Sequence, residues 1–358
     1  MTDTTPTIRW ELSTAYELFL SLHVLHMPEY YGIRASWAAG IRSRIPAAER
    51  KFLEEVLPFI GFPLAWAYGL PAPKDAISAL WALKQIPAAE RIPSLFECDR
   101  DSSKPEPCIG TLLDIARRGS WDANDLKLYT SQLMDESKFK YTEAAIRTNL
   151  DWWARPAEFG EMFLAALQAF HQAFFEEEEK RVLPVLESGL KRAQEIAKSL
   201  DLAELVPVLS KGVHSEEINE FKEVIIAPAF WTTPLIVLEK LNDDQILFLF
   251  GARPDTMSAI PGELVPDSLL RTLKALADPT RLKILHLLTQ GEVTPSQLAR
   301  RLNLRAPTVT HHLSELRFSG LVNVTFRGQE KFYTSRLEAL DTTCTNLRDF
   351  LQNAPEEF

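Results

Sequence analysis

The sequence predicts a mainly helical α+β protein, and three observations support this class. Apolar residues recur at helical spacing through most of residues 8–220. Residues 223–250 instead contain short runs of β-branched and aromatic residues, which are typical of strands. A stretch rich in Gly, Pro and Ser at 252–266 then precedes a second, strongly helical pattern.

These shifts in composition predict a helical domain over residues 1–251, a linker over 252–266 and a second domain over 267–358. The 358 residues suffice for two cores, and 46% apolar with 25% charged residues is ordinary for a globular protein. The sequence has no apolar run of about 18 residues and no secretion signal. Three cysteines are too few for a disulfide framework, so we expect a cytoplasmic protein with no membrane contact.

The charge is unevenly distributed along the chain. Residues 267–340 contain eleven Lys and Arg against six Asp and Glu, a net charge of +5, within a chain whose net charge is −10. The remainder therefore carries −15. A basic module attached to an acidic body is typical of a nucleic-acid-binding domain joined to a domain with another role.

The first domain begins with an amphipathic pattern in which Leu12, Tyr16, Phe19 and His23 share one face of a helix. A longer periodic stretch starts at Pro156, and Pro184 within it is expected to kink or break the helix, because proline lacks the N–H donor. Three short strands follow, separated by turn signals, and we expect a small antiparallel meander covered by helices on one face. These strands are Glu223–Phe230, Leu235–Glu239 and Gln245–Phe250.

The second domain has sharper signals. A leucine-faced helix lies near Leu269–Leu276, and two further helices start with a capping residue followed by proline, at Asp278 and at Thr294. The phrase PTVTHHLSELRFSG gives a fourth helix, two strands flank Gly328, and a last helix ends near Gln352. This order of helices, with a two-stranded wing before the last one, predicts a winged helix-turn-helix.

The phrases LKALADPTRLKILHLL and QLARRLNLRAPTVTHHLSELRFSGLV, together with the wing, resemble the ArsR-type family of bacterial transcriptional regulators. The resemblance covers roughly residues 267–340, about a fifth of the chain. It implies a homodimer that pairs through its first and last helices, here Leu269–Leu276 and Leu337–Leu351, and binds a palindromic DNA operator. It favours repression over activation.

The upstream region resembles a helical domain of unassigned role that precedes ArsR-type modules in some bacterial regulators. The resemblance rests on ELFLSLHVLHMPEYYGIRASW near the N-terminus and on the strand block VIIAPAFWTTPLIVLEKLNDDQILFLFGARPD. It implies an architecture and no particular ligand.

On a helical wheel, Val309, Leu313 and Leu316 form the buried stripe of the fourth helix, and His311 falls on the opposite side. His312 falls about 100° away from His311, so the two imidazoles are poorly placed to share a metal. His312 is expected either to pack or to contact phosphate. The residues that we expect to contact DNA are Arg305, Thr308, Thr310, His311, His312 and Ser314 on this helix, and Arg327 and Lys331 on the wing.

The family's metal-sensing positions are vacant in this chain. The third helix has no cysteine, and the last helix has one cysteine and no histidine, whereas soft and borderline metals need thiolate or imidazole clusters. We therefore expect no cofactor and no metal site in the second domain.

The first domain is rich in aromatic residues, which predicts an apolar pocket for a small-molecule effector. Its candidate lining residues are His26, Tyr30, Trp37, Trp153 and His171. No catalytic motif is present, so we expect no enzyme activity. The alternative is a metal-dependent enzyme or metal sensor that uses His23, His26, His171 and a carboxylate, and Cys98 with Cys108 is a conceivable redox pair.

Overall fold

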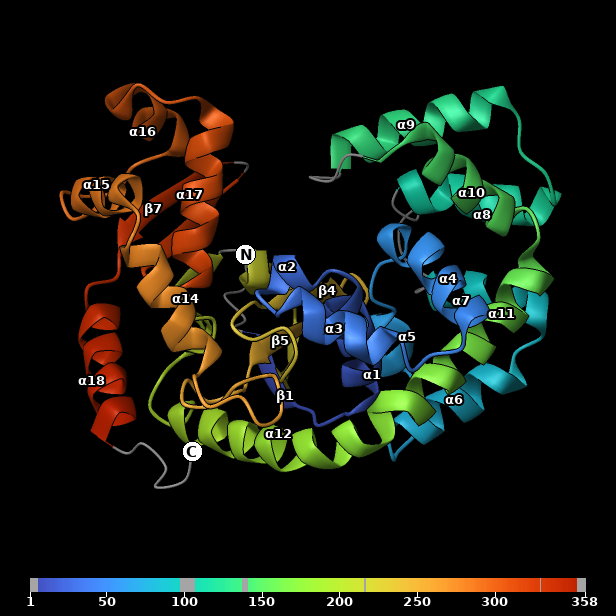
Figure 1. Ribbon diagram of the computed structural model, residues 1–358, viewed down its shortest axis with the longest axis horizontal. Helices are drawn as coiled ribbons and strands as arrows, with labels where there is room; N and C mark the ends of the chain where they lie inside the picture. Colours follow the sequence, from blue (N-terminus) through green and yellow to red (C-terminus); the bar gives the residue numbers. More distant parts are fainter. Residues whose placement is uncertain (1–5, 97–106, 137–140, 216, 329, 353–358) are drawn as a thin grey trace.

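The computed structural model describes residues 6–96, 107–136, 141–215, 217–328 and 330–352. The chain forms an open arch (Figure 1). The long helix α12, Glu176–Ile196, runs along its base, and the C-terminal helices form one arm. Helices α8 to α10 form the other arm, while a sheet and helices α1 to α3 lie between the arms.

The first 209 residues are mainly helical, as the sequence predicts. Apolar faces at helical spacing drive these helices to pack on one another. Besides α12, the helices are α1 Ala15–His26, α2 Pro28–Tyr31, α3 Ala35–Arg42, α4 Ala47–Val56, α5 Leu64–Tyr68, α6 Ala76–Gln85, α7 Ala88–Phe96, α8 Pro107–Arg118, α9 Ala123–Glu136, α10 Glu143–Trp153, α11 Pro156–Phe170 and α13 Leu202–Leu209.

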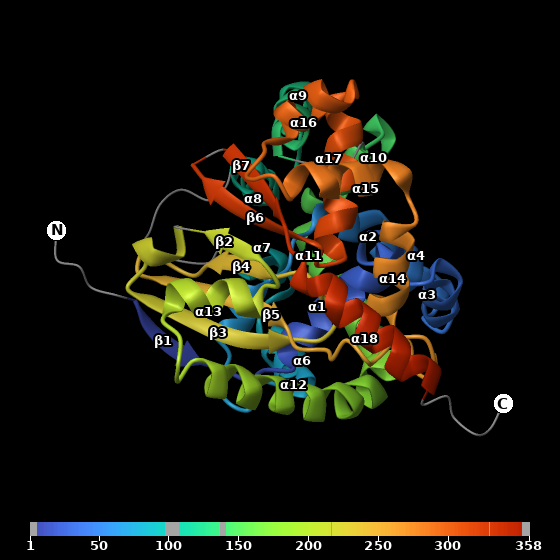
Figure 2. The same ribbon diagram turned by 90° about the vertical axis from the view of Figure 1, so that its left-hand side faces the viewer.

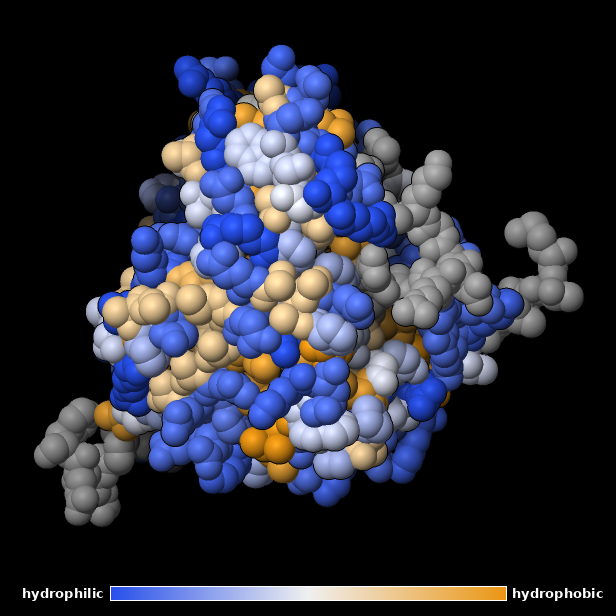
Figure 3. All heavy atoms as spheres, turned by 90° about the vertical axis from the view of Figure 1, so that its right-hand side faces the viewer, coloured by the Kyte–Doolittle hydropathy of each residue, from blue (hydrophilic) through white to orange (hydrophobic). Residues whose placement is uncertain are grey.

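Of the two effects expected of Pro184, a kink or a break of the long helix, the break is wrong. Helix α12 continues through it, and a π-helical turn at His171–Phe175 joins α12 to α11. The side of the molecule that includes the α8–α10 arm carries hydrophobic residues in scattered patches among hydrophilic ones (Figure 3). Ile77 and Trp81 on α6 are among the exposed apolar side chains of the domain.

The antiparallel meander predicted from the sequence is wrong in its pairing. The strands are β1 Thr7–Trp10, β3 Glu223–Ala229, β4 Val237–Lys240 and β5 Gln245–Gly251. The order is β1-β3-β5-β4, in which β1 and β5 run parallel to β3 and only β4 is antiparallel to its neighbour β5. Val224 to Ala229 are all buried, and successive side chains point to opposite faces, so both faces of the sheet are covered. The prediction of cover on one face is therefore also wrong.

The C-terminal arm has the predicted winged helix-turn-helix order. Asp278 and Thr294 cap their helices by accepting backbone hydrogen bonds, as the sequence indicates. The elements are α14 Asp267–Leu276, α15 Pro279–Leu288, α16 Pro295–Leu302, α17 Ala306–Phe318, β6 Val322–Arg327, β7 Glu330–Ser335 and α18 Glu338–Gln352.

A strand of the first domain extends the wing. Strand β2, Val213–Ser215, pairs in parallel with β6, so the wing sheet has the order β2-β6-β7 (Figure 2). The sequence analysis predicted a two-stranded wing and did not find β2.

The structure contains two apolar cores. The larger core takes its buried residues from Ala15 to Ile260, and the smaller one from Ala275 to Val322. The predicted linker is packed rather than exposed over part of its length, because Ala259 and Ile260 are buried in the larger core. Direct contacts join the two parts: Arg271 Nη2 donates to the Tyr31 carbonyl at 2.6 Å, and the Tyr30 and Phe318 rings are 5.7 Å apart.

Candidate nucleic-acid interface

The turn before α17 is held by local hydrogen bonds. Thr294 and Gln297 form a reciprocal capping box at the start of α16, with bonds of 2.9 and 3.3 Å. Asn303 ends α16 in the left-handed conformation, with φ of 52°, which Asn tolerates better than most residues. These local features fix the direction in which α17 leaves the turn.

Helix α17 has one buried stripe and one exposed polar face, as the helical wheel predicts. Val309, Leu313 and Leu316 are buried, whereas Thr308, Thr310 and His311 are exposed. Arg305 occupies the N-cap position without capping the helix and is also exposed. The exposed face therefore presents hydroxyl, imidazole and guanidinium groups at one end of the helix.

His312 is directed away from this exposed face. Its ring is 14% exposed, and its Nδ1 lies 4.0 Å from Asp278 Oδ1 at the start of α15. Asp278 accepts a hydrogen bond from the Arg281 amide, and that bond lowers the pKa of the carboxyl below its usual value. His312 thus packs between two helices, and Ser314 on the same helix is half-buried.

The two basic residues of the wing are exposed but engaged. Arg327 makes a two-pronged ion pair with Glu292, at 2.8 and 3.0 Å, and its guanidinium lies 4.7 Å from the Phe332 ring centre. Lys331 Nζ lies 5.2 Å from the Phe326 ring centre. Glu292 was missed in the sequence because it lies 35 residues from Arg327. Arg327 must break its ion pair with Glu292 before both of its Nη atoms can contact a phosphate.

The five predicted effector residues contact different neighbours. Trp37 stacks on Trp231 with ring centres 6.0 Å apart, and Tyr30 contacts the end of α17. Trp153 is buried on α10. His26 Nδ1 bonds to the Leu22 carbonyl.

His171 is buried in the π-helical turn, with its ring 6.4 Å from the Phe175 ring. None of the five predicted effector residues lines either of two cavities found between the first domain and the winged helix.

The histidine pair of α1 lies in an apolar setting. His23 packs on Phe62 with ring centres 4.6 Å apart, and burial lowers the pKa values of His23 and His26 to about 3 and about 4. In the part of the chain that the structure describes, no three His, Cys, Asp or Glu side chains are grouped to hold a metal ion. Cys108 is buried, and Cys98 lies outside the described residues.

Residues 278–324 match the profile of a family described as "Bacterial regulatory protein, arsR family". The HTH-type transcriptional regulator CmtR of Mycobacterium tuberculosis (strain ATCC 25618 / H37Rv) is 45% identical over 71 residues. That match covers 20% of this chain and 60% of CmtR. The transcriptional repressor SdpR of Bacillus subtilis (strain 168) is 30% identical over 84 residues, which are 24% of this chain and 93% of SdpR.

Among solved structures, the winged helix-turn-helix DNA-binding domain of Mb0332 from Mycobacterium bovis is 26% identical, with a TM-score of 0.21. It is described as homodimeric and as a possible ArsR-family transcriptional regulator, and the match covers 26% of this chain and 86% of that one. Within the described ranges, no helix is both long and apolar enough to cross a membrane.

Proposed function

The chain belongs to the arsR family of bacterial regulatory proteins, and on this premise we propose that it is a homodimeric repressor with a ligand-sensing N-terminal domain. It is a DNA-binding transcriptional regulator by family. The observation that carries the rest of the proposal is the exposed polar face of α17 beside a basic wing. We keep the division at residues 252–266 as part of the proposal, supported by the two separate cores.

In this proposal α17 enters the major groove of double-stranded DNA. Thr308, Thr310 and His311 contact base edges, while Arg305 contacts the backbone at the start of the helix. Arg327 and Lys331 contact phosphates through the wing, which adds affinity and little sequence information. His312 acts by packing and Ser314 contacts the groove from its half-buried position.

The homodimer is supported by apolar side chains that this chain leaves uncovered. Helix α18 has no buried residue, although Leu351 lies on it and Leu337 precedes it. Leu270 on α14 is 43% exposed. Exposed leucines on or beside two neighbouring helices support an interface there. A two-fold dimer places the α17 helices for half-sites about 34–36 Å apart on a palindromic operator.

The acidic first domain is proposed to sense a small-molecule effector in the cytoplasm, and we assign it no catalytic role. Two regulatory states differ in the geometry of the dimer, and the effector shifts the population between them. Repression is supported by the name of the relative SdpR, a transcriptional repressor.

The DNA-reading face is tested by fluorescence anisotropy with duplex DNA from upstream of the protein's own gene. Thr310→Ala and His311→Ala should each weaken specific binding by about 5- to 150-fold, the range for loss of a base contact. Lys191→Ala is the matched control, because Lys191 is exposed on α12, outside the winged helix. Wild-type affinities in both α17 variants, or no binding to the upstream DNA by the wild type, would contradict the proposal.

A further inference from the structure

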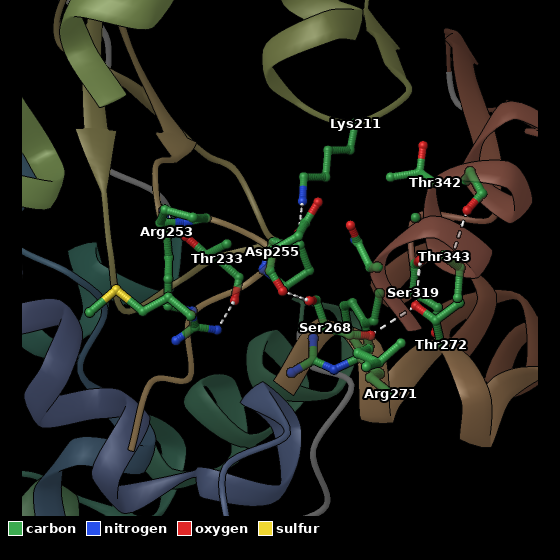
Figure 4. Close-up of a pocket in the computed structure, with 18 of the residues that line it drawn as sticks. Lys211, Thr233, Arg253, Asp255, Ser268, Arg271, Thr272, Ser319, Thr342 and Thr343 are labelled. Atoms are coloured by element: carbon green, nitrogen blue, oxygen red, sulfur yellow. Dashed lines mark hydrogen bonds and ion pairs between the residues drawn. The ribbon is translucent and has the colours of Figure 1, made fainter. Parts of the chain in front are cut away.

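A cavity lies at the junction between the two domains, with a volume of about 100 Å³ (Figure 4). One wall includes Lys211 of the first domain and Arg253 of the 252–266 segment, and the opposite wall comes from α14 and α18. Buried waters need roughly 10–15 Å³ each by the same kind of measure, so this space fits several waters or a small polyatomic ligand.

The lining of this cavity is positively charged. It contains Lys211, Arg253, Arg271 and Arg336, and a single carboxylate, Asp255. Asp255 pairs with Lys211 at 2.5 Å. The carboxylates of Asp267 and Glu338 approach Arg253 and Arg336 at 3.6 and 3.0 Å, but neither lines the cavity. The lining therefore has three more positive than negative charges.

Two guanidinium groups at this junction each have one buried nitrogen without an acceptor, although their Nη2 atoms donate to the Thr233 and Ser210 carbonyls. Arg253 is 6% exposed, and its Nη1 is buried without a hydrogen-bond partner. Arg317 Nη1 is also buried without a partner, but Arg317 does not line the cavity. Burial is the main cause that lowers the pKa of Arg253 and Arg317 to about 10. Asp267 opposes this shift at Arg253, and the charge of Arg336 contributes to it at Arg317. A buried donor without an acceptor costs free energy, which an anion would offset.

The cavity is connected to the wing through a short segment. Lys211 has a φ of 54°, and Gly212 after it packs against Asn323 of β6. The amide of Val324 in β6 donates to the Gly212 carbonyl at 2.8 Å. Lys211 is therefore one residue away from a main-chain hydrogen bond to the strand that carries the wing.

We propose that this cavity binds a small anion with a phosphate or carboxylate group, and that its occupation alters the seating of the winged helix on the first domain. Guanidinium groups recognise both chemical groups through paired hydrogen bonds. The proposal deepens the sensing role given above and rests on it. It places the effector at the junction rather than among the five aromatic and histidine residues predicted from the sequence.

Inorganic phosphate and acetate are the probes, each compared with sodium chloride at equal ionic strength. We expect one of them to raise the melting temperature of the full chain and to bind in calorimetry. Arg336→Met and Lys211→Met should raise the Kd for that anion at least tenfold. Lys283→Met, on the exposed face of α15, is the matched control and should bind as the wild type does.

Circular dichroism establishes that each variant is folded, and Arg336→Lys, which keeps the charge, separates loss of charge from loss of the paired geometry. No stabilisation beyond chloride by either anion, or wild-type Kd in both Met variants, overturns the cavity proposal. Trp37→Phe abolishing anion binding while Arg336→Met does not would place the site in the first domain and also overturns it. DNA binding is measured separately, so failure of the cavity and failure of the regulator function are distinguishable.

Discussion

Arg327 shows how one residue can be correctly placed on a surface and still be engaged elsewhere. The sequence puts it at the tip of the wing, and the structure confirms that it is exposed there. Its guanidinium is paired with Glu292, whose side chain is 40% exposed. Exposed ion pairs contribute about 0–1 kcal/mol, so DNA phosphate can displace Glu292 at small cost. Glu292 also places a negative charge beside the proposed DNA path.

We predict that Glu292→Gln raises the affinity for DNA by about two- to fivefold, because it frees Arg327 and removes a repulsive charge.

Arg327→Ala and Lys331→Ala should each lower the affinity for all DNA sequences and reduce the slope of log K against log salt concentration by about one. Anisotropy titrations at several salt concentrations measure both effects. Unchanged binding in both wing variants would refute the wing contacts.

Glu17 is a buried carboxylate with a structural role. It is fully buried on α1 and accepts hydrogen bonds from the amides of Phe230 and Trp231, at 2.6 and 3.2 Å. Burial raises its pKa to about 7, although these two amide bonds oppose the shift. The folded state therefore binds a proton at Glu17 more tightly than the unfolded chain does.

Because its pKa is raised, Glu17 adds to the free energy of unfolding at low pH. This contribution is full below pH 4.5 and is lost as the pH rises through about 7. We predict that Glu17→Gln removes this loss, a difference on the order of 3 kcal/mol across that window. Urea unfolding of both proteins between pH 5 and 8 measures it. Glu187→Gln, exposed on α12, should keep the wild-type slope. Parallel curves for Glu17→Gln and wild type would contradict the prediction.

At the scale of elements, the strand β2 links the two domains through main-chain hydrogen bonds. Val213–Ser215 pairs with β6, and Arg317 at the end of α17 donates to the Ser210 carbonyl at 2.9 Å. Gly212 has a φ of 101°, and an added Cβ would lie 2.4 Å from Asn323 Oδ1. A side chain at this position is therefore both strained and obstructed.

We predict that Gly212→Ala destabilises this attachment by about 1–3 kcal/mol, the cost of forcing a side chain into such a backbone conformation. The amide of Val324, which donates to Gly212, should then exchange its hydrogen faster. Hydrogen exchange followed by mass spectrometry gives the measurement. Gly40→Ala, where a Cβ meets no atom within 4 Å, is the control. Unchanged protection of β6 in Gly212→Ala would mean that the attachment does not depend on this glycine.

At the scale of the whole molecule, α14 and α18 carry exposed leucine side chains. In Figure 2, α18 crosses the near face of the molecule, beside α14. Leu270 and Leu351 are 43% and 67% exposed. A second copy that covers these side chains would form a dimer. The distance between its two α17 helices would then depend on how the first domain of each copy packs against α14.

We predict that the double variant Leu270→Lys with Leu351→Lys is monomeric at micromolar concentration, because charged groups are costly at the centre of an interface. Its affinity for the upstream DNA should fall by about 100-fold, since one half-site is lost. Analytical ultracentrifugation measures the assembly. The control, Ile77→Lys with Trp81→Lys, changes two apolar side chains on α6 that are exposed to a similar extent as Leu270 and Leu351. It should leave the assembly unchanged. A wild-type protein that sediments as a monomer would contradict the homodimer.

The sequence by itself determined the winged helix-turn-helix and the exposed side of α17. The caps at Asp278 and Thr294 and the stripe through Val309 act within a few residues, so local pattern suffices to place them. The family resemblance has the same origin, since it rests on one uninterrupted stretch of about 70 residues.

Only the tertiary structure decided which distant segments meet. Strand β1 pairs with β3 more than 200 residues away, β2 joins the wing, and Arg327 meets Glu292. None of the five residues predicted to form one pocket lines the basic junction cavity, which draws on both domains. The local sequence indicates which segments can form strands and which side chains can pair. The strand register and the actual partners depend on long-range packing, which no local pattern contains.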